Sequence, residues 1–93
     1  MDVKDAVKKA LSYVAEVFEE DRPENIGLEE VVLNDETNQW EITVGFSRPW
    51  DYPKPGVLTN MQPQHPKRRY KIVTIDNDSG EVKSIKIREI PDA

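Results

Sequence analysis

The sequence WEITVGFS, residues 40–47, decides the fold class. Every second residue is apolar, from Trp40 to Phe46, and this period of two is typical of a strand with one buried face. Residues 28–33 show the same period more weakly. Residues 34–38 between them read NDETN, side chains that favour a tight turn. The sequence therefore predicts a β-hairpin in this part of the chain.

A second hairpin and one helix complete the predicted fold. Residues 70–75 and 81–90 have strand character and flank DNDSG, residues 76–80, which favours a turn. The first twenty residues instead repeat apolar side chains every three or four positions, and Asp2 can serve as a helix N-cap. We therefore predict an α+β fold: one N-terminal amphipathic helix packed on a four-stranded antiparallel sheet, in the order α-β-β-long insert-β-β.

The composition describes one small domain. The chain has 93 residues, of which 37% are hydrophobic, no cysteine and a net charge of −5. We treat residues 1–93 as a single domain without disulfides. The first residues, MDVKDAVKKAL, lack the basic segment and apolar run of a signal peptide, and no apolar run is long enough to cross a membrane. We therefore expect a cytoplasmic location.

Residues 48–68 form a basic, proline-rich insert between the two predicted hairpins. They hold five of the seven prolines and show neither helical nor strand periodicity. The charge is unevenly distributed, with −8 over residues 1–47, +5 over residues 48–71 and −2 over residues 72–93. Long connections in compact domains are usually functional or disordered. The insert is therefore the first place to look for a function.

The insert supplies the candidate partner-binding residues. Its cations attract acidic surfaces, and aromatic rings often anchor protein interfaces. Trp50 and Tyr52 have a second interpretation, as additional core packed against the sheet. Cations interleaved with aromatics can also bind a single nucleic-acid strand, but the acidic remainder of the chain disfavours nucleic acid and membranes. The candidates are Arg48, Trp50, Tyr52, Lys54, Lys67, Arg68 and Arg69.

The sequence shows no catalytic or metal-binding constellation, so we expect neither enzyme activity nor a cofactor. His65 is the only histidine, and no carboxylate is spaced to orient it. Residues 76–81 begin like an EF-hand calcium loop, but Glu81 stands where that loop needs glycine and Ile87 where it needs an acid. PQHPKR, residues 63–68, matches a polyproline ligand, with a stiff spacer as the alternative.

Apolar side chains are expected on both faces of the predicted sheet. Val31 and Val32 are adjacent in the first strand, and Ile72 and Val73 are adjacent in the third. Because neighbouring residues of a strand point to opposite faces, one member of each pair faces away from the helix. We therefore expect the insert, a second subunit or a partner protein to cover that face.

The chain resembles two families of small α+β domains. Its order of helix, hairpin, long connection and hairpin resembles the cystatin-like arrangement. YKIVTIDNDSGEVK, residues 70–83, looks like the ending of PepSY-type domains, and this resemblance implies a binding or inhibitory module. Cystatin inhibitors bind cysteine proteases through a QxVxG-type first hairpin loop. The hairpin here reads NDETNQW, so the resemblance transfers no inhibitory residue.

These observations predict a non-enzymatic protein-binding or inhibitory module that uses the basic proline- and aromatic-containing insert. Two alternatives remain. One is a structural homodimer in which the open face of the sheet is self-complementary. The other is a domain that binds a small ligand under the insert, for which Asp51 or His65 would need a role.

Overall fold

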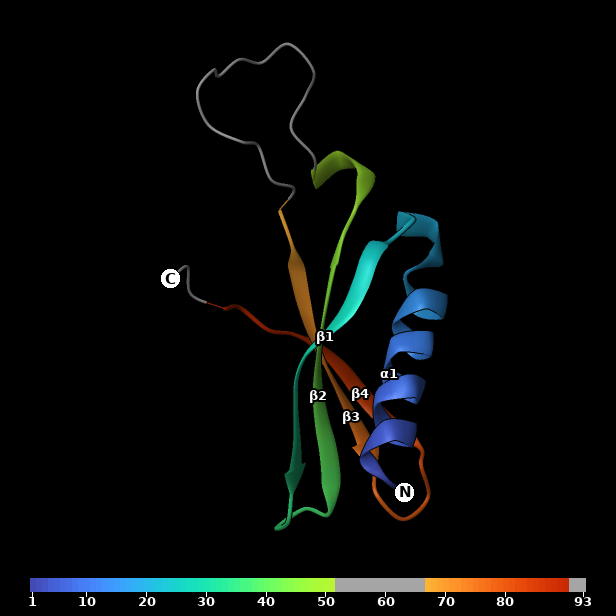
Figure 1. Ribbon diagram of the computed structural model, residues 1–93, viewed down its shortest axis with the longest axis vertical. Helices are drawn as coiled ribbons and strands as arrows, with labels where there is room; N and C mark the ends of the chain where they lie inside the picture. Colours follow the sequence, from blue (N-terminus) through green and yellow to red (C-terminus); the bar gives the residue numbers. More distant parts are fainter. Residues whose placement is uncertain (52–66, 91–93) are drawn as a thin grey trace.

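The computed structural model describes residues 1–51 and 67–90. Within these ranges it contains one α-helix and four strands, which form a single antiparallel sheet in the order β1-β2-β3-β4. The helix lies along one face of the sheet (Figure 1), which confirms the predicted α+β fold. The elements are α1 (Val3–Val17), β1 (Glu24–Asn34), β2 (Gln39–Ser47), β3 (Arg69–Asp76) and β4 (Val82–Ile87), with short 3-10 turns at Glu19–Asp21 and Pro49–Asp51.

Helix α1 begins where predicted and ends earlier. The carboxylate of Asp2 accepts a hydrogen bond from the backbone N–H of Asp5 at 2.8 Å and so caps the helix. Ala6, Ala10 and Val14, four residues apart, are fully buried against the sheet. Residues 19 and 20, predicted to be helical, form a 3-10 turn with Asp21 instead, and the chain then reverses at Arg22, whose φ is 49°.

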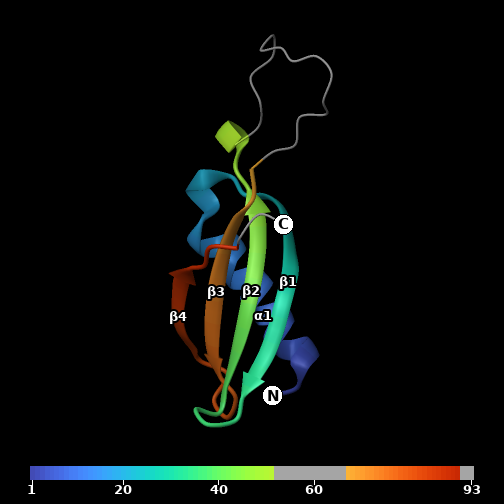
Figure 2. The same cartoon turned by 90° about the vertical axis from the view of Figure 1, so that its left-hand side faces the viewer.

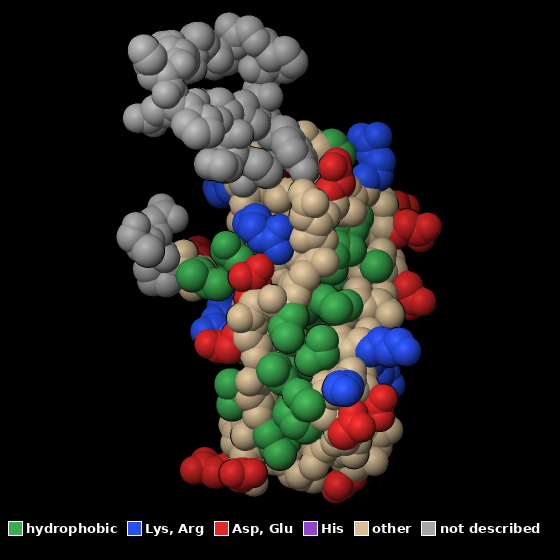
Figure 3. Space-filling model, viewed as in Figure 1, with side chains coloured by type: hydrophobic (Ala, Val, Ile, Leu, Met, Phe, Trp, Pro, Cys, Tyr) green, Lys and Arg blue, Asp and Glu red, His purple; other side chains and the backbone are tan. Residues whose placement is uncertain are grey.

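The core lies between α1 and the two central strands. Ile42 of β2 lies beside Val31 of β1 and Val73 of β3. Cross-strand neighbours share a face, so these three side chains point toward the helix. At one end of the core the rings of Phe18 and Phe46 pack with their centroids 5.3 Å apart. Figure 3 shows hydrophobic side chains along the junction between α1 and the β1 edge of the sheet.

No helix among the described residues covers the opposite face of the sheet, which is called the open face below (Figure 2). Val32 is paired with Glu41, and Ile72 is paired with Thr43. Both apolar residues therefore lie on the open face, so apolar side chains do point to both faces, as predicted. Val32 is 45% exposed.

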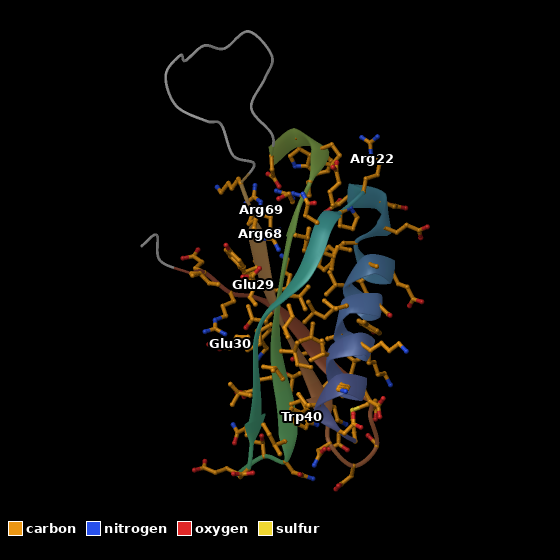
Figure 4. The ribbon with its side chains drawn as sticks, viewed as in Figure 1. Arg22, Glu29, Glu30, Trp40, Arg68 and Arg69 are labelled. Atoms are coloured by element: carbon orange, nitrogen blue, oxygen red, sulfur yellow. The ribbon has the colours of Figure 1, made fainter. Side chains whose placement is uncertain are left out.

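Two ion pairs cross the centre of the open face. Arg68 binds Glu29 at 3.0 Å and Arg88 binds Glu30 at 2.7 Å, and in Figure 4 Glu29, Glu30 and Arg68 lie on the side of the sheet away from α1. Arg88 also donates a hydrogen bond to the hydroxyl of Thr43, which is buried. Charged side chains of the chain itself thus lie over the centre of this face. Arg68 belongs to the insert, one of the three covers that the sequence predicts for this face, and insert residues 52–66 lie outside the described residues.

The two hairpin turns are joined at the end of the sheet away from the insert. Gly80 has the positive φ expected of its turn, 73°. The backbone N–H of Asn77 donates to the carbonyl of Asn38 at 3.0 Å, and Nε1 of Trp40 donates to Oδ1 of Asn77 at 2.9 Å. These bonds fix one end of the sheet. The candidate site lies at the other end, where β2 leads into the insert and the chain returns as β3.

Candidate binding site at the insert end of the sheet

Asp51 joins the two ends of the insert. Its backbone N–H donates to the carbonyl of Arg48 at 2.9 Å, which closes a tight turn directly after β2. Its backbone carbonyl accepts a hydrogen bond from the N–H of Lys67 at 3.0 Å, just before β3. Residues 48–51 and 67–69 are therefore held side by side, although 15 residues separate Asp51 from Lys67. The side chains of both segments share one surface as a result.

The Asp51 carboxylate is a buried anion between two arginines. Its side chain is 3% exposed, Oδ2 lies 3.2 Å from Nε of Arg48, and Oδ1 lies 3.1 Å from an Nη atom of Arg69. Burial by itself raises the pKa of Asp51, but the hydrogen bonds from Arg48 and Arg69 outweigh burial and lower the pKa to about 2. Asp51 is therefore ionised at neutral pH and acts as a structural counter-ion.

A groove of about 900 Å³ lies at this end of the sheet, between the end of α1, the start of β3 and the end of β4. Six cations and two acids line it, together with apolar side chains that include Phe18, Phe46 and Ile87. The groove is therefore strongly cationic in a chain whose net charge is −5. The six cations are Arg48, Lys67, Arg68, Arg69, Lys71 and Arg88, and the two acids are Asp21 and Glu89.

The four arginines of the groove are paired with carboxylates, and the two lysines are not. Among the described residues, no carboxylate lies within ion-pair distance of Lys67 or Lys71. Nζ of Lys71 lies 5.2 Å from the centre of the Phe18 ring, a cation–π contact that leaves the charge uncompensated. These two ammonium groups are the charges best placed to bind a negatively charged partner.

The structure brings together four of the seven residues predicted from the sequence. Arg48, Lys67, Arg68 and Arg69 all line the groove. Trp50 does not line it, and its ring lies 5.0 Å from the guanidinium carbon of Arg48. Trp50 is 56% exposed, so its interpretation as additional core is wrong. Tyr52 and Lys54, like His65 and most of PQHPKR, lie outside the described residues.

Sequence reasoning missed three contributors to this site. Lys71 and Arg88 were counted only as charges, because each belongs to a segment with strand character. The available signal in the sequence was the predicted hairpin of residues 70–75 and 81–90, whose open end lies next to the insert. In the structure its register pairs Lys71 with Ile87, the neighbour of Arg88. The sequence suggests a role for Asp51 only in the small-ligand alternative, and it contains no signal for the ion pairs of Asp51 because Arg69 is 18 residues away.

Comparisons with protein-family models, curated proteins and solved structures found no match to this chain. The described residues contain no group of three or more histidine, cysteine, aspartate or glutamate side chains placed to hold a metal ion. No helix in the described part of the chain is long and apolar enough to span a membrane. The groove places fixed cations beside exposed apolar side chains, an arrangement suited to binding carboxylates on an otherwise apolar or aromatic segment.

Proposed function

We propose that the protein is a non-enzymatic protein-binding module whose groove binds an acidic segment of a partner protein. The observation that carries this proposal is the pair of ammonium groups, Lys67 and Lys71, that have no carboxylate partner among the described residues in a groove with six cations. An acidic partner would be attracted to the groove within about one Debye length and repelled by the acidic remainder of the chain, which orients the encounter.

Exposed aromatic surface next to the groove supports the same proposal. Trp50 is 56% exposed and its ring lies beside the Arg48 guanidinium. Tryptophan and arginine are the residues most often found at the energetic centres of protein interfaces. The acidic −8 segment of residues 1–47 opposes binding of long polyanions such as nucleic acid, which extend beyond a single groove. The resemblance to PepSY-type domains, which implies a binding or inhibitory module, agrees with this proposal.

A matched pair of charge-reversal variants tests the proposed function. Lys67→Glu with Lys71→Glu reverses the two unpaired cations, and Lys4→Glu with Lys8→Glu makes the same change in net charge on the exposed side of α1. We expect proteins captured by the immobilised wild-type domain to be retained by the α1 variant and lost by the groove variant, and to elute with added salt. Equal recovery on all three proteins would contradict the proposal.

A small anionic ligand is the second candidate, because a groove of about 900 Å³ falls within the size range of small-molecule sites. Thermal stabilisation of the wild-type domain by a panel of carboxylated and phosphorylated metabolites distinguishes the two candidates. A shift produced by one metabolite and absent in the groove variant would favour the small ligand. A homodimer would instead show as a concentration-dependent mass in sedimentation.

A further inference from the structure

The outer edge of β4 is open next to the cationic groove. β4 is the last strand of the sheet, and helix α1 packs chiefly on β1 and β2. The isoleucines at this end of β4 are correspondingly exposed: Ile87 is 75% exposed, and Ile90, just beyond the strand, is 40% exposed. After β4 the chain turns toward the open face, as Figures 1 and 2 both show. A segment that continued straight past Ile87 would therefore lie beside the groove.

The hydrogen-bonding direction of this edge follows from one bond. The backbone N–H of Arg88 donates inward to the carbonyl of Tyr70 on β3 at 3.0 Å. Along an antiparallel strand the backbone groups point alternately to the two sides. The N–H and C=O groups of Ile87 and Ile85 therefore point outward, away from β3, where no strand of the described residues is paired with them. This edge can accept another strand.

The other edge strand of the sheet, β1, is less suited to accepting another strand at the insert end. β1 contains register shifts between Glu24 and Gly27 and between Leu28 and Glu30, and Asn25 has a φ of 55°. Such bulges interrupt the regular spacing that strand addition requires. Three glutamates of residues 24–30 also surround this part of β1. From Ser84 to Ile87, by contrast, β4 pairs with β3 without a shift.

We infer that the acidic partner segment binds in extended form, as a fifth strand beside β4, and reaches the groove beyond Ile87. The side chains of β4 specify its pattern. Ile85 and Ile87 point to the helix side, and Lys86, paired with Ile72, points to the open face. A matching strand alternates apolar residues beside the isoleucines with acidic residues beside the lysine. This inference rests on the proposed function and names the conformation and sequence pattern of the partner.

Charge argues against a second copy of the chain as the occupant. Val82–Ile87 contains two lysines and no acid. Lys83 is paired with Glu81, just before the strand, at 3.4 Å, but Lys86 has no carboxylate partner among the described residues, so pairing two β4 strands would bring two uncompensated lysines close together. Like charges on neighbouring strands destabilise a sheet. An acidic segment from another protein removes this repulsion. If this segment runs antiparallel to β4 with its acidic end toward the groove, it also places further carboxylates beside Lys67 and Lys71.

A defined probe tests strand addition directly. The probe is the eight-residue peptide Asp-Asp-Val-Glu-Val-Glu-Val-Thr, and binding is followed through the backbone amide signals of the isotope-labelled domain. We expect the largest shifts, and slowed hydrogen exchange, at Ile85 and Ile87. Directly opposed residues of paired strands share a face, so the valines lie opposite Ile85 and Ile87. The backbone N–H groups of the valines then point toward β4 and donate hydrogen bonds to the outward carbonyls of these isoleucines. N-methylation of the valines should abolish binding, whereas N-methylation of the glutamates should leave it within about twofold of the parent peptide.

A pair of protein variants provides an independent measurement. In Ile87→Pro the outward N–H is lost while every bond to β3 remains, so binding should weaken about fivefold or more. Ile87→Thr removes the same apolar side chain but keeps the N–H, and it should retain more affinity than the proline variant. If Ile87→Pro does not fold, the methylated peptides still decide the question on the wild-type domain.

The outcomes separate this inference from the proposed function. A peptide of the same composition with its valines grouped together should bind much more weakly. If it binds equally well and shifts only groove residues, strand addition is wrong while acidic recognition by the groove stands. Concentration-dependent shifts at Ile85 and Ile87 without peptide would identify a second copy as the occupant and overturn the inference. Absence of binding by every peptide up to about 1 mM would also overturn it, and the capture experiment would then decide the proposed function separately.

Discussion

Asp51 and Arg69 lie 18 residues apart in the sequence, yet an Nη atom of Arg69 donates to Oδ1 of Asp51 at 3.1 Å. This bond connects the segment after β2 to the first residue of β3. Together with the bond between Asp51 and Arg48, it holds two arginines of the groove in fixed positions. The geometry of the cationic site therefore depends on one buried carboxylate.

Replacing Asp51 with Asn should destabilise the domain by about 1–3 kcal/mol. The amide removes the negative charge between two arginines and leaves a neutral group where a charged hydrogen-bond acceptor is buried. Urea denaturation followed by circular dichroism measures the change. Asp35→Asn, an exposed position in the β1–β2 turn, serves as the control and should change stability by less than about 0.5 kcal/mol. Equal stabilities of the two variants would show that Asp51 does not stabilise the fold.

The contribution of Asp51 to stability should disappear in acid. The folded pKa of about 2 lies below 3.8, the ordinary pKa of an aspartate, so the unfolded chain takes up this proton at higher pH than the folded chain does. The contribution, about 2 kcal/mol, is complete above about pH 4 to 5 and is lost as the pH falls toward 2. The stability difference between wild type and Asp51→Asn should therefore narrow between pH 5 and pH 2. A difference that stays constant over this range would contradict the assignment.

Gly45→Ala should disturb the Glu29–Arg68 ion pair. A Cβ at position 45 would lie 2.7 Å from an Nη atom of Arg68 and 2.8 Å from Oε2 of Glu29, so both side-chain ends must move. Without this clash, alanine in a strand is more favourable for stability than glycine by about 0.5–1 kcal/mol. We expect Gly45→Ala to be more favourable in an Arg68→Ala background than in the wild type, by about 0.5–1 kcal/mol. A double-mutant cycle from urea midpoints measures this coupling, and additive effects would mean that the two residues do not interact.

The fluorescence of Trp50 should report the positive potential at the site. Trp50 is exposed beside Arg48, whereas the other tryptophan, Trp40, is partly buried and hydrogen-bonded to Asn77. In a Trp40→Phe variant we expect iodide to quench the remaining emission more strongly than caesium does, relative to free tryptophan. Adding Lys67→Glu and Lys71→Glu should reduce this preference. Identical iodide-to-caesium ratios in both proteins would show that the lysines do not set the local potential.

The elements of the fold were predictable because each has a strong local period. The alternation in WEITVGFS predicted strand β2, and the apolar stripe of the first helix is buried at Ala6, Ala10 and Val14. The prediction that β2 has only one buried face is wrong, because residues 42–47 are buried on both faces, Thr43 and Ser47 included. Boundaries were less accurate. Residues 19–21 leave the α-helix because the chain must reverse at Arg22 to start β1, and β4 ends at Ile87, three residues short of the predicted strand. Such ends depend on where neighbouring strands stop, which local periodicity does not encode.

The sequence by itself determined the fold class, the helix cap at Asp2, the turn at Gly80 and the separation of a basic insert from an acidic remainder, because these depend on neighbouring residues. Only the tertiary structure decided which cations form the site. Backbone pairing of β3 with β2 and β4 brings Lys71 and Arg88 beside Arg48, and burial around Asp51 fixes two of the arginines. The physical reason is that charge interactions act over a few ångströms in space, whatever the distance along the chain.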